Sequence, residues 1–210
     1  MPFVNNPLVN YLRKLSLAYI GSELIPVQMR TKLLNILGAK LDPTATIWPD
    51  CHIRSTDISM GEESFINVGF FFDGTASFSV GKNVRVGQFL RIITGTHDIG
   101  PSSHRCIIEA VHGDVVIEDG CWIGANVTIL PGVTVGQGCV VGANSLLNAS
   151  TEPNGLYVGT PARRIRDLPL TAVPPQTTRN GEKIPAPFPP LQRTGATSRK
   201  SVGTEKTASD

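Results

Sequence analysis

The chain contains 210 residues, of which 40% are hydrophobic and 17% charged, with a formal net charge of +2 at neutral pH. This composition is typical of a globular domain, and because residues 1–170 carry a net charge of only −1, no nucleic-acid groove is indicated. No apolar run approaches the roughly 18 residues that span a bilayer, so we expect no integral membrane segment and a cytoplasmic location.

Residues 1–40 are expected to form a segment of two helices. Asn6 can cap a helix that starts at Pro7 and ends at Gly21, and a second helix is expected from about Pro26 to Leu37. Apolar residues recur at helical spacing in both: Leu8, Leu12, Leu15 and Tyr19 in the first, and Val27, Leu33, Leu34 and Leu37 in the second. We expect these residues to pack the helices on the rest of the fold.

From residue 41 onward, aliphatic and aromatic side chains recur every six residues, which is the period of neither a helix nor a simple strand. They form five sets of three: Leu41, Ile47, Ile53; Met60, Ile66, Phe72; Val80, Val86, Ile92; Ile117, Ile123, Ile129; and Val135, Val141, Leu147. This repeat predicts an all-β core, a parallel β-helix of about five triangular coils that spans residues 41–166. Each short strand would place one of these side chains inside.

A second position of the repeat supports the same fold. Small or β-branched residues occur four positions after the inward-facing residue, as expected at a tight corner: Cys51, Ser64, Val84, Cys121, Val127, Val133, Cys139 and Ser145. Cys121 and Cys139 are 18 residues apart and would occupy equivalent corners of adjacent coils. We expect two packed thiols there, with neither a disulfide nor a metal.

The repeat is interrupted only after the third strand of a coil. The interval there grows to 7, 8 and then 25 residues, and the longest interruption is a loop from His97 to Asp114. Because loops on rigid scaffolds often carry function, we expect the functional site at this edge. Beyond the coils, residues 167–210 are predicted to be a disordered tail, because the chain from Thr171 onward is rich in Pro, Ser, Thr, Gly and charge.

Several motifs resemble those of the hexapeptide-repeat acyltransferases. They are "SFINVGFFFD", "ITGTHDIG", "WIGANVTILPGVTVGQGCVVGANSLL" and "VGTPARRIR", and the resemblance covers about residues 41–166. It is closest to the sugar O-acetyltransferases, which include galactoside, maltose and polysaccharide acetyltransferases. The resemblance implies a left-handed β-helix, a homotrimer with its sites between subunits, acetyl-CoA as acyl donor, and a sugar or glycan hydroxyl as acceptor.

By the same resemblance, His97 in "GTHD" matches the family's catalytic histidine. An alcohol is a weak nucleophile at neutral pH, so its attack on a thioester benefits from a base with a pKa near 7, which histidine provides. Asn67 matches a residue that hydrogen-bonds in the active site to the acceptor or the reacting centre. Asp73 resembles an aspartate that binds sugar hydroxyls, and Trp122 is expected to form a wall of the acceptor and pantetheine site.

The remaining site residues concern the oxyanion and coenzyme A. The Ala125 main-chain amide is the candidate donor to the oxyanion of the tetrahedral intermediate. Guanidinium groups suit the phosphates of coenzyme A. The positions that match coenzyme A contacts of the family are Gly124, Ala125, Ala143, Asn148, Arg163 and Arg166. Arg164 is expected to be a solvated neighbour. Relatives often carry Thr-Lys where this chain has Asn148 and Ala149, so one cationic phosphate contact is missing.

Two other functions remain open at this point. A zinc enzyme like the γ-class carbonic anhydrases would need three histidines that converge on one metal, whereas only His97 lies next to the coil framework at the interruption. A non-catalytic scaffold or coenzyme A-binding protein is the other alternative. The histidine, Asn67 and the arginines of the motif favour an enzyme, an acetyl-CoA-dependent O-acetyltransferase without a metal.

Overall fold

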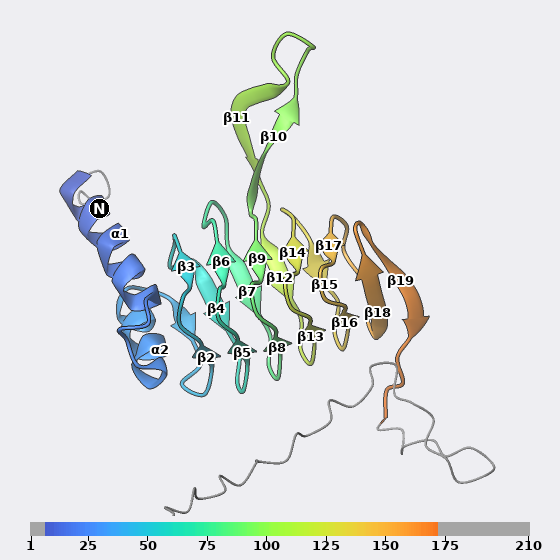
Figure 1. The fold of residues 1–210 in the computed structure, drawn as a ribbon, viewed down its shortest axis with the longest axis horizontal. Helices are drawn as coiled ribbons and strands as arrows, with labels where there is room; N and C mark the ends of the chain where they lie inside the picture. The colour runs from blue at the N-terminus through green and yellow to red at the C-terminus, as the bar shows by residue number, and fades with distance from the viewer. Residues whose placement is uncertain (1–6, 172–210) are drawn as a thin grey trace, which may run out of the picture. The chain divides into compact units, whose positions relative to one another are not determined.

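The computed structural model describes residues 7–171, and these form two helices followed by a column of stacked strands (Figure 1). The helices are α1 (Pro7–Gly21) and α2 (Val27–Ile36). The strands of the first three coils are β1 (Lys40–Leu41), β2 (Thr46–Ile47), β3 (His52–Ile53), β4 (Ile58–Met60), β5 (Phe65–Ile66), β6 (Phe71–Phe72), β7 (Phe78–Val80), β8 (Arg85–Val86) and β9 (Arg91–Ile92).

A hairpin of β10 (Gly95–Ile99) and β11 (Cys106–His112) then leaves the column (Figure 1). Two further coils follow, with strands β12 (Val115–Ile117), β13 (Trp122–Ile123), β14 (Thr128–Ile129), β15 (Thr134–Val135), β16 (Val140–Val141) and β17 (Leu146–Leu147). The chain continues through β18 (Gly155–Gly159) and ends its described part with β19 (Ala162–Asp167). The column is thus a β-solenoid of five complete coils and a partial sixth, as the repeat predicted.

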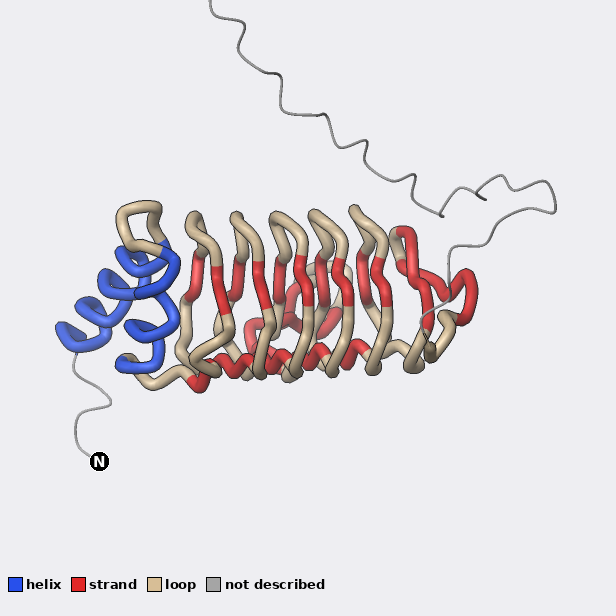
Figure 2. The backbone as a smooth tube through the Cα atoms, turned by 90° about the horizontal axis from the view of Figure 1, so that it is seen from below, coloured by secondary structure: helices blue, strands red, loops and turns tan. Residues whose placement is uncertain are grey.

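The coils stack into three parallel sheets, which we name A, B and C (Figure 2). Sheet A has the order β1-β4-β7-β12-β15, sheet C the order β17-β14-β9-β6-β3, and sheet B the order β19-β18-β16-β13-β8-β5-β2. Equivalent residues of successive coils pair directly, for example Ile47 with Ile66 and Ile66 with Val86. Each coil therefore has three edges, which we name A–B, B–C and C–A after the sheets that meet there.

The inside of the column is the hydrophobic core. Every side chain of the six-residue repeat is at most 5% exposed, and so is every corner residue predicted to be tucked in. These predictions are confirmed. The three cysteines of the column, Cys51, Cys121 and Cys139, are buried free thiols, and burial raises the pKa of Cys51 to about 11 and that of Cys121 to about 12.

The helices cover the N-terminal end of the column, as expected, but the face that α1 uses was predicted wrongly. Leu17 and Ile20 are buried against the core, whereas the predicted stripe is exposed: Leu8 62%, Leu12 52%, Leu15 48% and Tyr19 56%. Helical spacing alone cannot choose between two apolar stripes on one helix, and Leu17 and Ile20 form the second stripe. In α2 the prediction holds, since Leu34 is buried and Leu33 and Leu37 pack partly against the core.

Arg30 of α2 is fully buried at this end of the column, and sequence analysis did not identify it. Its guanidinium donates to the carbonyls of Ile20, Ser22, Ile25 and Ile47 at 2.8 to 2.9 Å, without a carboxylate partner among the described residues. Burial lowers the pKa of Arg30. The four carbonyls satisfy the buried guanidinium, which would otherwise be costly.

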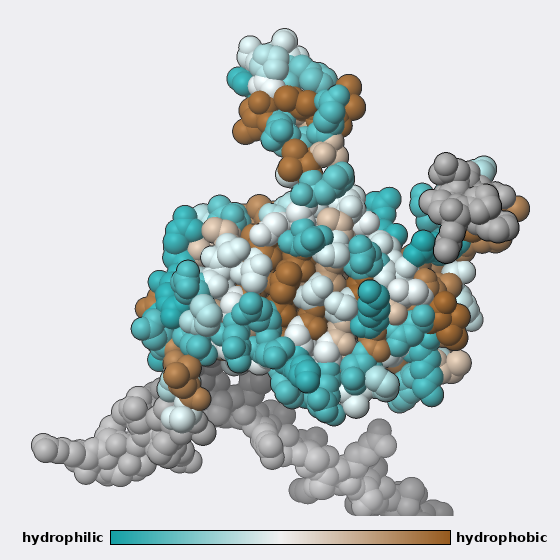
Figure 3. All heavy atoms as spheres, turned by 180° about the vertical axis from the view of Figure 1, so that it is seen from behind, coloured by the Kyte–Doolittle hydropathy of each residue, from teal (hydrophilic) through white to brown (hydrophobic). Residues whose placement is uncertain are grey.

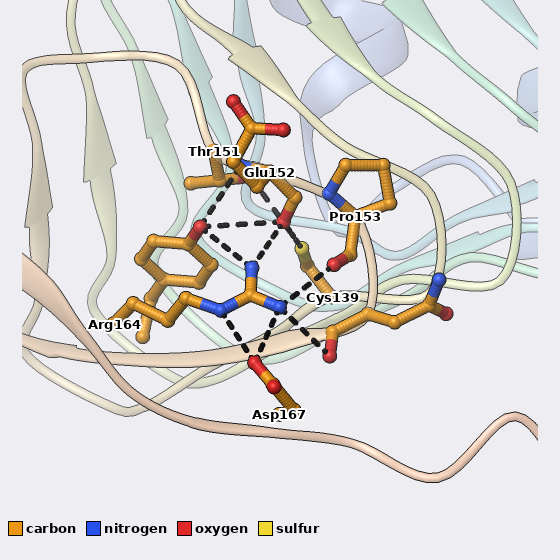
Figure 4. A network of polar contacts seen from close by, with 8 residues as sticks. Cys139, Thr151, Glu152, Pro153, Arg164 and Asp167 are labelled. Atoms are coloured by element: carbon orange, nitrogen blue, oxygen red, sulfur yellow. Dashed lines mark hydrogen bonds and ion pairs between the residues drawn. The ribbon is translucent and has the colours of Figure 1, made fainter.

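The opposite end is closed by the antiparallel pair β18–β19. Arg164 was expected to be a solvated neighbour, and it is exposed. Its guanidinium also forms an ion pair with Asp167 and donates to the Glu152 carbonyl at 2.9 Å and the Tyr157 hydroxyl at 3.1 Å (Figure 4), which sequence analysis did not foresee. It also donates to the Pro153 carbonyl. The arginine run gave no indication of which guanidinium would turn toward the column.

Within residues 7–171, no helix is long and apolar enough to cross a membrane. The tail was predicted to begin at residue 167, but Asp167 still belongs to β19 and the Leu168 amide donates to the Asn154 carbonyl at 2.7 Å. Residues 172–210 lie outside the described residues, so their predicted disorder stays an expectation.

Candidate functional site

The predicted base, His97, lies in the middle of β10, on the hairpin that leaves the column at the C–A edge. Its side chain is exposed, and its Nδ1 lies 2.7 Å from the carbonyl oxygen of Ile107 on the facing strand β11. Because a carbonyl can only accept, Nδ1 carries the proton of the neutral ring. The lone pair is then on Nε2, which is the arrangement that a general base requires.

The base of this hairpin is tied to the column by carboxylates. Asp73 accepts hydrogen bonds from the Thr94 amide at 3.0 Å, the Gly95 amide at 3.2 Å and the Thr94 hydroxyl. After the returning strand β11, Asp114 accepts from the amide and hydroxyl of Ser77 at 2.9 and 2.7 Å, and these bonds lower the pKa of Asp114. Asp73, predicted to bind the acceptor, therefore uses both its oxygens to hold the segment that leads to His97.

The hairpin itself is exposed beyond its base. Ile99 is 84% exposed and Ile108 is 81% exposed, and hydrophobic side chains are visible on the hairpin where it stands clear of the column (Figure 3). A two-stranded hairpin is marginally stable in water by itself. The exposed isoleucines therefore indicate a surface that favours contact with another molecule.

The B–C edge carries two candidate amide donors. The amides of Ala125 and Ala143 donate to no acceptor within the described residues, although the Ala125 carbonyl accepts from the Asn144 amide at 2.9 Å. Glycine lies beside each of them on the preceding coil. A Cβ at Gly87 would be 2.7 Å from the Ala125 nitrogen, and a Cβ at Gly124 would be 2.5 Å from the Ala143 nitrogen. Glycine thus leaves both N–H groups accessible to a ligand.

Asn67 lies on the same edge, on the second coil. Its Oδ1 accepts the Val68 amide at 2.8 Å, so its side-chain NH₂ remains available as a donor. Asn148 lies elsewhere: it follows β17 at the C–A edge and is exposed. The structure therefore does not bring Asn148 beside Ala125 and Ala143.

A row of residues projects from the outer face of sheet B, although one of them, Leu156, is only 4% exposed. Direct pairing joins Arg85 to Trp122, Trp122 to Val140, Val140 to Leu156, and Leu156 to Arg166. Directly opposed residues project from the same face of a sheet, so Trp122 and Arg166 share the outer face. They are three strand spacings apart, about 14 Å. Trp122 is 51% exposed there.

An irregularity in β18–β19 places the arginines. Val158 pairs with Arg163, Tyr157 with Arg164 and Leu156 with Arg166, so Ile165 is an extra residue in β19. Without this extra residue, Arg163 and Arg166 would project from opposite faces of the sheet. Because of it, both project from the same face as Leu156, and Arg164 projects from the other face. The bulge therefore explains why Arg164 clamps the end of the column while the two arginines predicted to meet phosphates point outward.

In a single chain the predicted residues form two separate groups. Asp73 and His97 lie at the C–A edge and its hairpin, whereas Asn67, Ala125, Ala143 and the sheet B row lie at or beyond the B–C edge, with the width of sheet C between the groups. Gly87 and Thr94 support these groups and were missed, because their role depends on contacts between coils. No cluster of three or more His, Cys, Asp or Glu side chains suited to a metal occurs within residues 7–171.

Comparison with known proteins agrees with the repeat and the fold. Residues 114–149 match the bacterial transferase hexapeptide family, described as six repeats. WcaF of Escherichia coli (strain K12), a candidate colanic acid biosynthesis acetyltransferase, is 30% identical over 150 residues, which cover 71% of this chain and 80% of WcaF. The galactoside O-acetyltransferase of Lactococcus lactis subsp. lactis (strain IL1403) is 31% identical over 162 residues, which cover 75% of each chain.

Among solved structures, a hexapeptide-repeat acetyltransferase from Vibrio cholerae O1 biovar eltor, crystallised with acetyl coenzyme A, has a similar fold. It superposes with a TM-score of 0.70 and 30% identity, covering 80% of this chain and 92% of that one. The repeat, the fold and these relatives lead to one conclusion: the chain belongs to the hexapeptide-repeat acetyltransferases, of the type that includes galactoside O-acetyltransferase.

Proposed function

We propose that the protein transfers the acetyl group of acetyl-CoA to a hydroxyl of a sugar, glycoside or polysaccharide precursor, with His97 as the general base. The observation that carries this proposal is the hydrogen bond from Nδ1 to the Ile107 carbonyl, which fixes the ring and leaves Nε2 as the basic atom. The galactoside and colanic acid relatives support a sugar or glycan acceptor.

In the proposed reaction, Nε2 of His97 takes the proton of the sugar hydroxyl as its oxygen attacks the thioester carbon. The oxyanion that forms accepts the Ala125 N–H, which has no acceptor within the described residues. Collapse of the intermediate breaks the carbon–sulfur bond, and the imidazolium returns its proton to the departing thiolate. The steps use only the two substrates, the His97 side chain and the Ala125 main-chain N–H.

The donor is proposed to lie along the B–C edge and the outer face of sheet B. The open Ala143 amide beside Gly124 suits an amide oxygen of the pantetheine arm, and Trp122 offers an apolar wall. Arg163 and Arg166 face outward and have no carboxylate partner among the described residues, so their charge is available to phosphates. The thin arm and the phosphates of coenzyme A would then follow one row of the sheet.

A homotrimer would bring the two groups of site residues together, because the hairpin of one subunit could then reach the B–C edge of the next. Two features of the single chain support this assembly. His97 is separated from Ala125 by the width of sheet C, and the isoleucines of the hairpin are exposed. Burying Ile99 and Ile108 against a neighbouring column would stabilise the hairpin and complete the site.

The proposal is tested by thiol release from acetyl-CoA across a panel of sugars and glycosides, with His97→Ala beside the wild type. Loss of the base should lower the rate by ~10²–10⁴-fold. The melting temperature should not change, because the His97 side chain is exposed. His104→Ala, also exposed on the loop between β10 and β11, is the matched control and should turn over normally. Equal rates for His97→Ala and wild type would refute the assignment.

A further inference from the structure

One residue of the B–C edge, Phe89, is of an unusual type for its backbone conformation. The third residue of this corner has a left-handed backbone in all five coils: Asp50 (φ 56°), Gly69 (φ 76°), Phe89 (φ 60°), Asn126 (φ 58°) and Asn144 (φ 60°). Gly, Asn and Asp tolerate this conformation, whereas a bulky side chain is strained in it. Phe89 is therefore the exception among five equivalent positions.

The fold does not need an aromatic ring at this position. In the following coils, the Asn126 side chain donates to Asn144 Oδ1 at 2.6 Å and accepts from Arg91 at 2.5 Å. An asparagine at position 89 would suit the backbone and could extend the same ladder by one coil. Local physics thus favours Asn, and a strained residue in its place points to a role outside folding.

About half of the Phe89 surface is covered by the protein and half is exposed to solvent. The ring covers Gly69 of the preceding coil, where any Cβ would overlap with it, and Phe89 remains 49% exposed. Gly69 thus provides the space in which the ring lies, and a substantial part of the ring stays open to solvent. A half-exposed aromatic ring over bare backbone is a ready platform for an apolar surface.

The position of the ring separates it from the groups proposed to hold the donor. Ala125, Ala143 and Arg166 lie on the fourth coil and beyond, toward the C-terminus. Phe89 lies on the third coil, from which the His97 hairpin leaves, and it covers the corner that carries Asn67. Along the B–C edge, Ala125 therefore lies between Phe89 on one side and the proposed phosphate contacts on the other.

We propose that the Phe89 ring is a binding platform for the acceptor, and that the C–H face of a pyranose ring packs on it while the sugar hydroxyls reach Asn67 and, in the proposed trimer, His97 of the partner subunit. This inference rests on the proposed function and adds to it the residue that selects the acceptor. A pyranose presents apolar C–H groups on one face and hydroxyls at its rim, so an aromatic surface beside an amide donor matches both.

The test compares wild type, Phe89→Asn and Phe89→Trp. We expect Phe89→Asn to raise the KM for the sugar by roughly 10-fold or more, with the KM for acetyl-CoA and the kcat little changed. Phe89→Trp should retain sugar affinity, because it keeps an aromatic face. Tyr11→Asn, which removes an aromatic side chain 59% exposed on α1, is the matched control and should change neither KM. A raised KM for acetyl-CoA with an unchanged sugar KM would overturn the proposal.

Binding measured without turnover separates this inference from the proposed function. Saturation-transfer NMR with a panel of methyl pyranosides would compare wild type and Phe89→Asn in the presence of coenzyme A. Signals lost only in the variant support the platform, even if no sugar is acetylated, in which case the proposed function alone fails. Equal signals in both proteins, or none in the wild type, overturn the platform. Thermal unfolding should show Phe89→Asn to be at least as stable as the wild type, which excludes misfolding as the cause.

Discussion

The two hairpins within residues 7–171 are both antiparallel pairs, but they are held in opposite ways. The pair β10–β11 is anchored only at its base, by Asp73 and Asp114, and its outer part is exposed. The pair β18–β19 continues sheet B, and Tyr157 and Arg164 bind it to the end of the column (Figure 4). The pair β10–β11 thus leaves its surface open to another molecule, whereas the pair β18–β19 closes the end of its own column.

Removing the first hairpin is expected to cause the largest loss of activity and only a small change in stability. Replacing residues 96–111 by Asn-Gly would close the strands at Gly95 and His112 with a two-residue turn. Acetyl transfer should fall by at least ~10³-fold, since the proposed general base is lost together with the proposed subunit contact. The melting temperature, followed by circular dichroism, should stay close to that of the wild type. A large drop would show that the hairpin supports the coils.

Thiol labelling distinguishes the two regions directly. Cys106 is exposed on β11, whereas Cys139 is buried next to β18–β19, with its Sγ 3.1 Å from the Glu152 carbonyl. We expect at most one thiol per chain, that of Cys106, to react with an aromatic disulfide reagent under native conditions, rapidly in a monomer and more slowly where the proposed trimer covers the Ile99 face. The three buried thiols of the column should react only after unfolding. Cys106→Ser should abolish the reaction under native conditions. Labelling of a second thiol at a comparable rate would contradict the burial of the column.

The same burial predicts a loss of stability at alkaline pH. The pKa values of Cys51 and Cys121 are raised from 9.0 to about 11 and about 12, and burial is the main cause. Between pH 9 and 11 the unfolded chain loses these protons while the folded chain keeps them, so the free energy of unfolding should fall by about 1.4 kcal/mol per pH unit for each thiol. Cys121→Ala should reduce this slope in denaturant titrations, and an unchanged slope in this variant would contradict the prediction.

The smallest effect is expected from a single hydroxyl of the second hairpin. Tyr157 is buried, and its hydroxyl accepts the Glu152 amide at 2.8 Å and the Arg164 guanidinium at 3.1 Å. Tyr157→Phe should lower the free energy of unfolding by about 1–3 kcal/mol, because the Glu152 amide loses its acceptor. This corresponds to roughly 2–4 °C in melting temperature per kcal/mol. The kcat should be unchanged, and a fall in kcat at equal stability would assign this hairpin a part in the reaction.

The sequence predicted what depends on period and missed what depends on contacts between coils. The inward positions and their small corners were predictable because one inward side chain per strand imposes a spacing of six. Leu8 and Leu12 were placed on the wrong face, because α1 carries two apolar stripes. The bulge at Ile165 was not predictable either, because it depends on the register of β18 and β19. In the candidate site, the motif was enough to propose His97, whereas the strain at Phe89 becomes visible only through its φ angle.

The buried guanidinium of Arg30 has a consequence for how the N-terminal end of the molecule opens. Its four acceptors belong to α1, the turn after it and β2, and the side chain itself belongs to α2. None of these segments can detach without stranding a charged donor in an apolar environment. We therefore expect the two helices and the first coil to behave as one cooperative unit in native-state hydrogen exchange, with amides on α2 and β2 exchanging through a common opening.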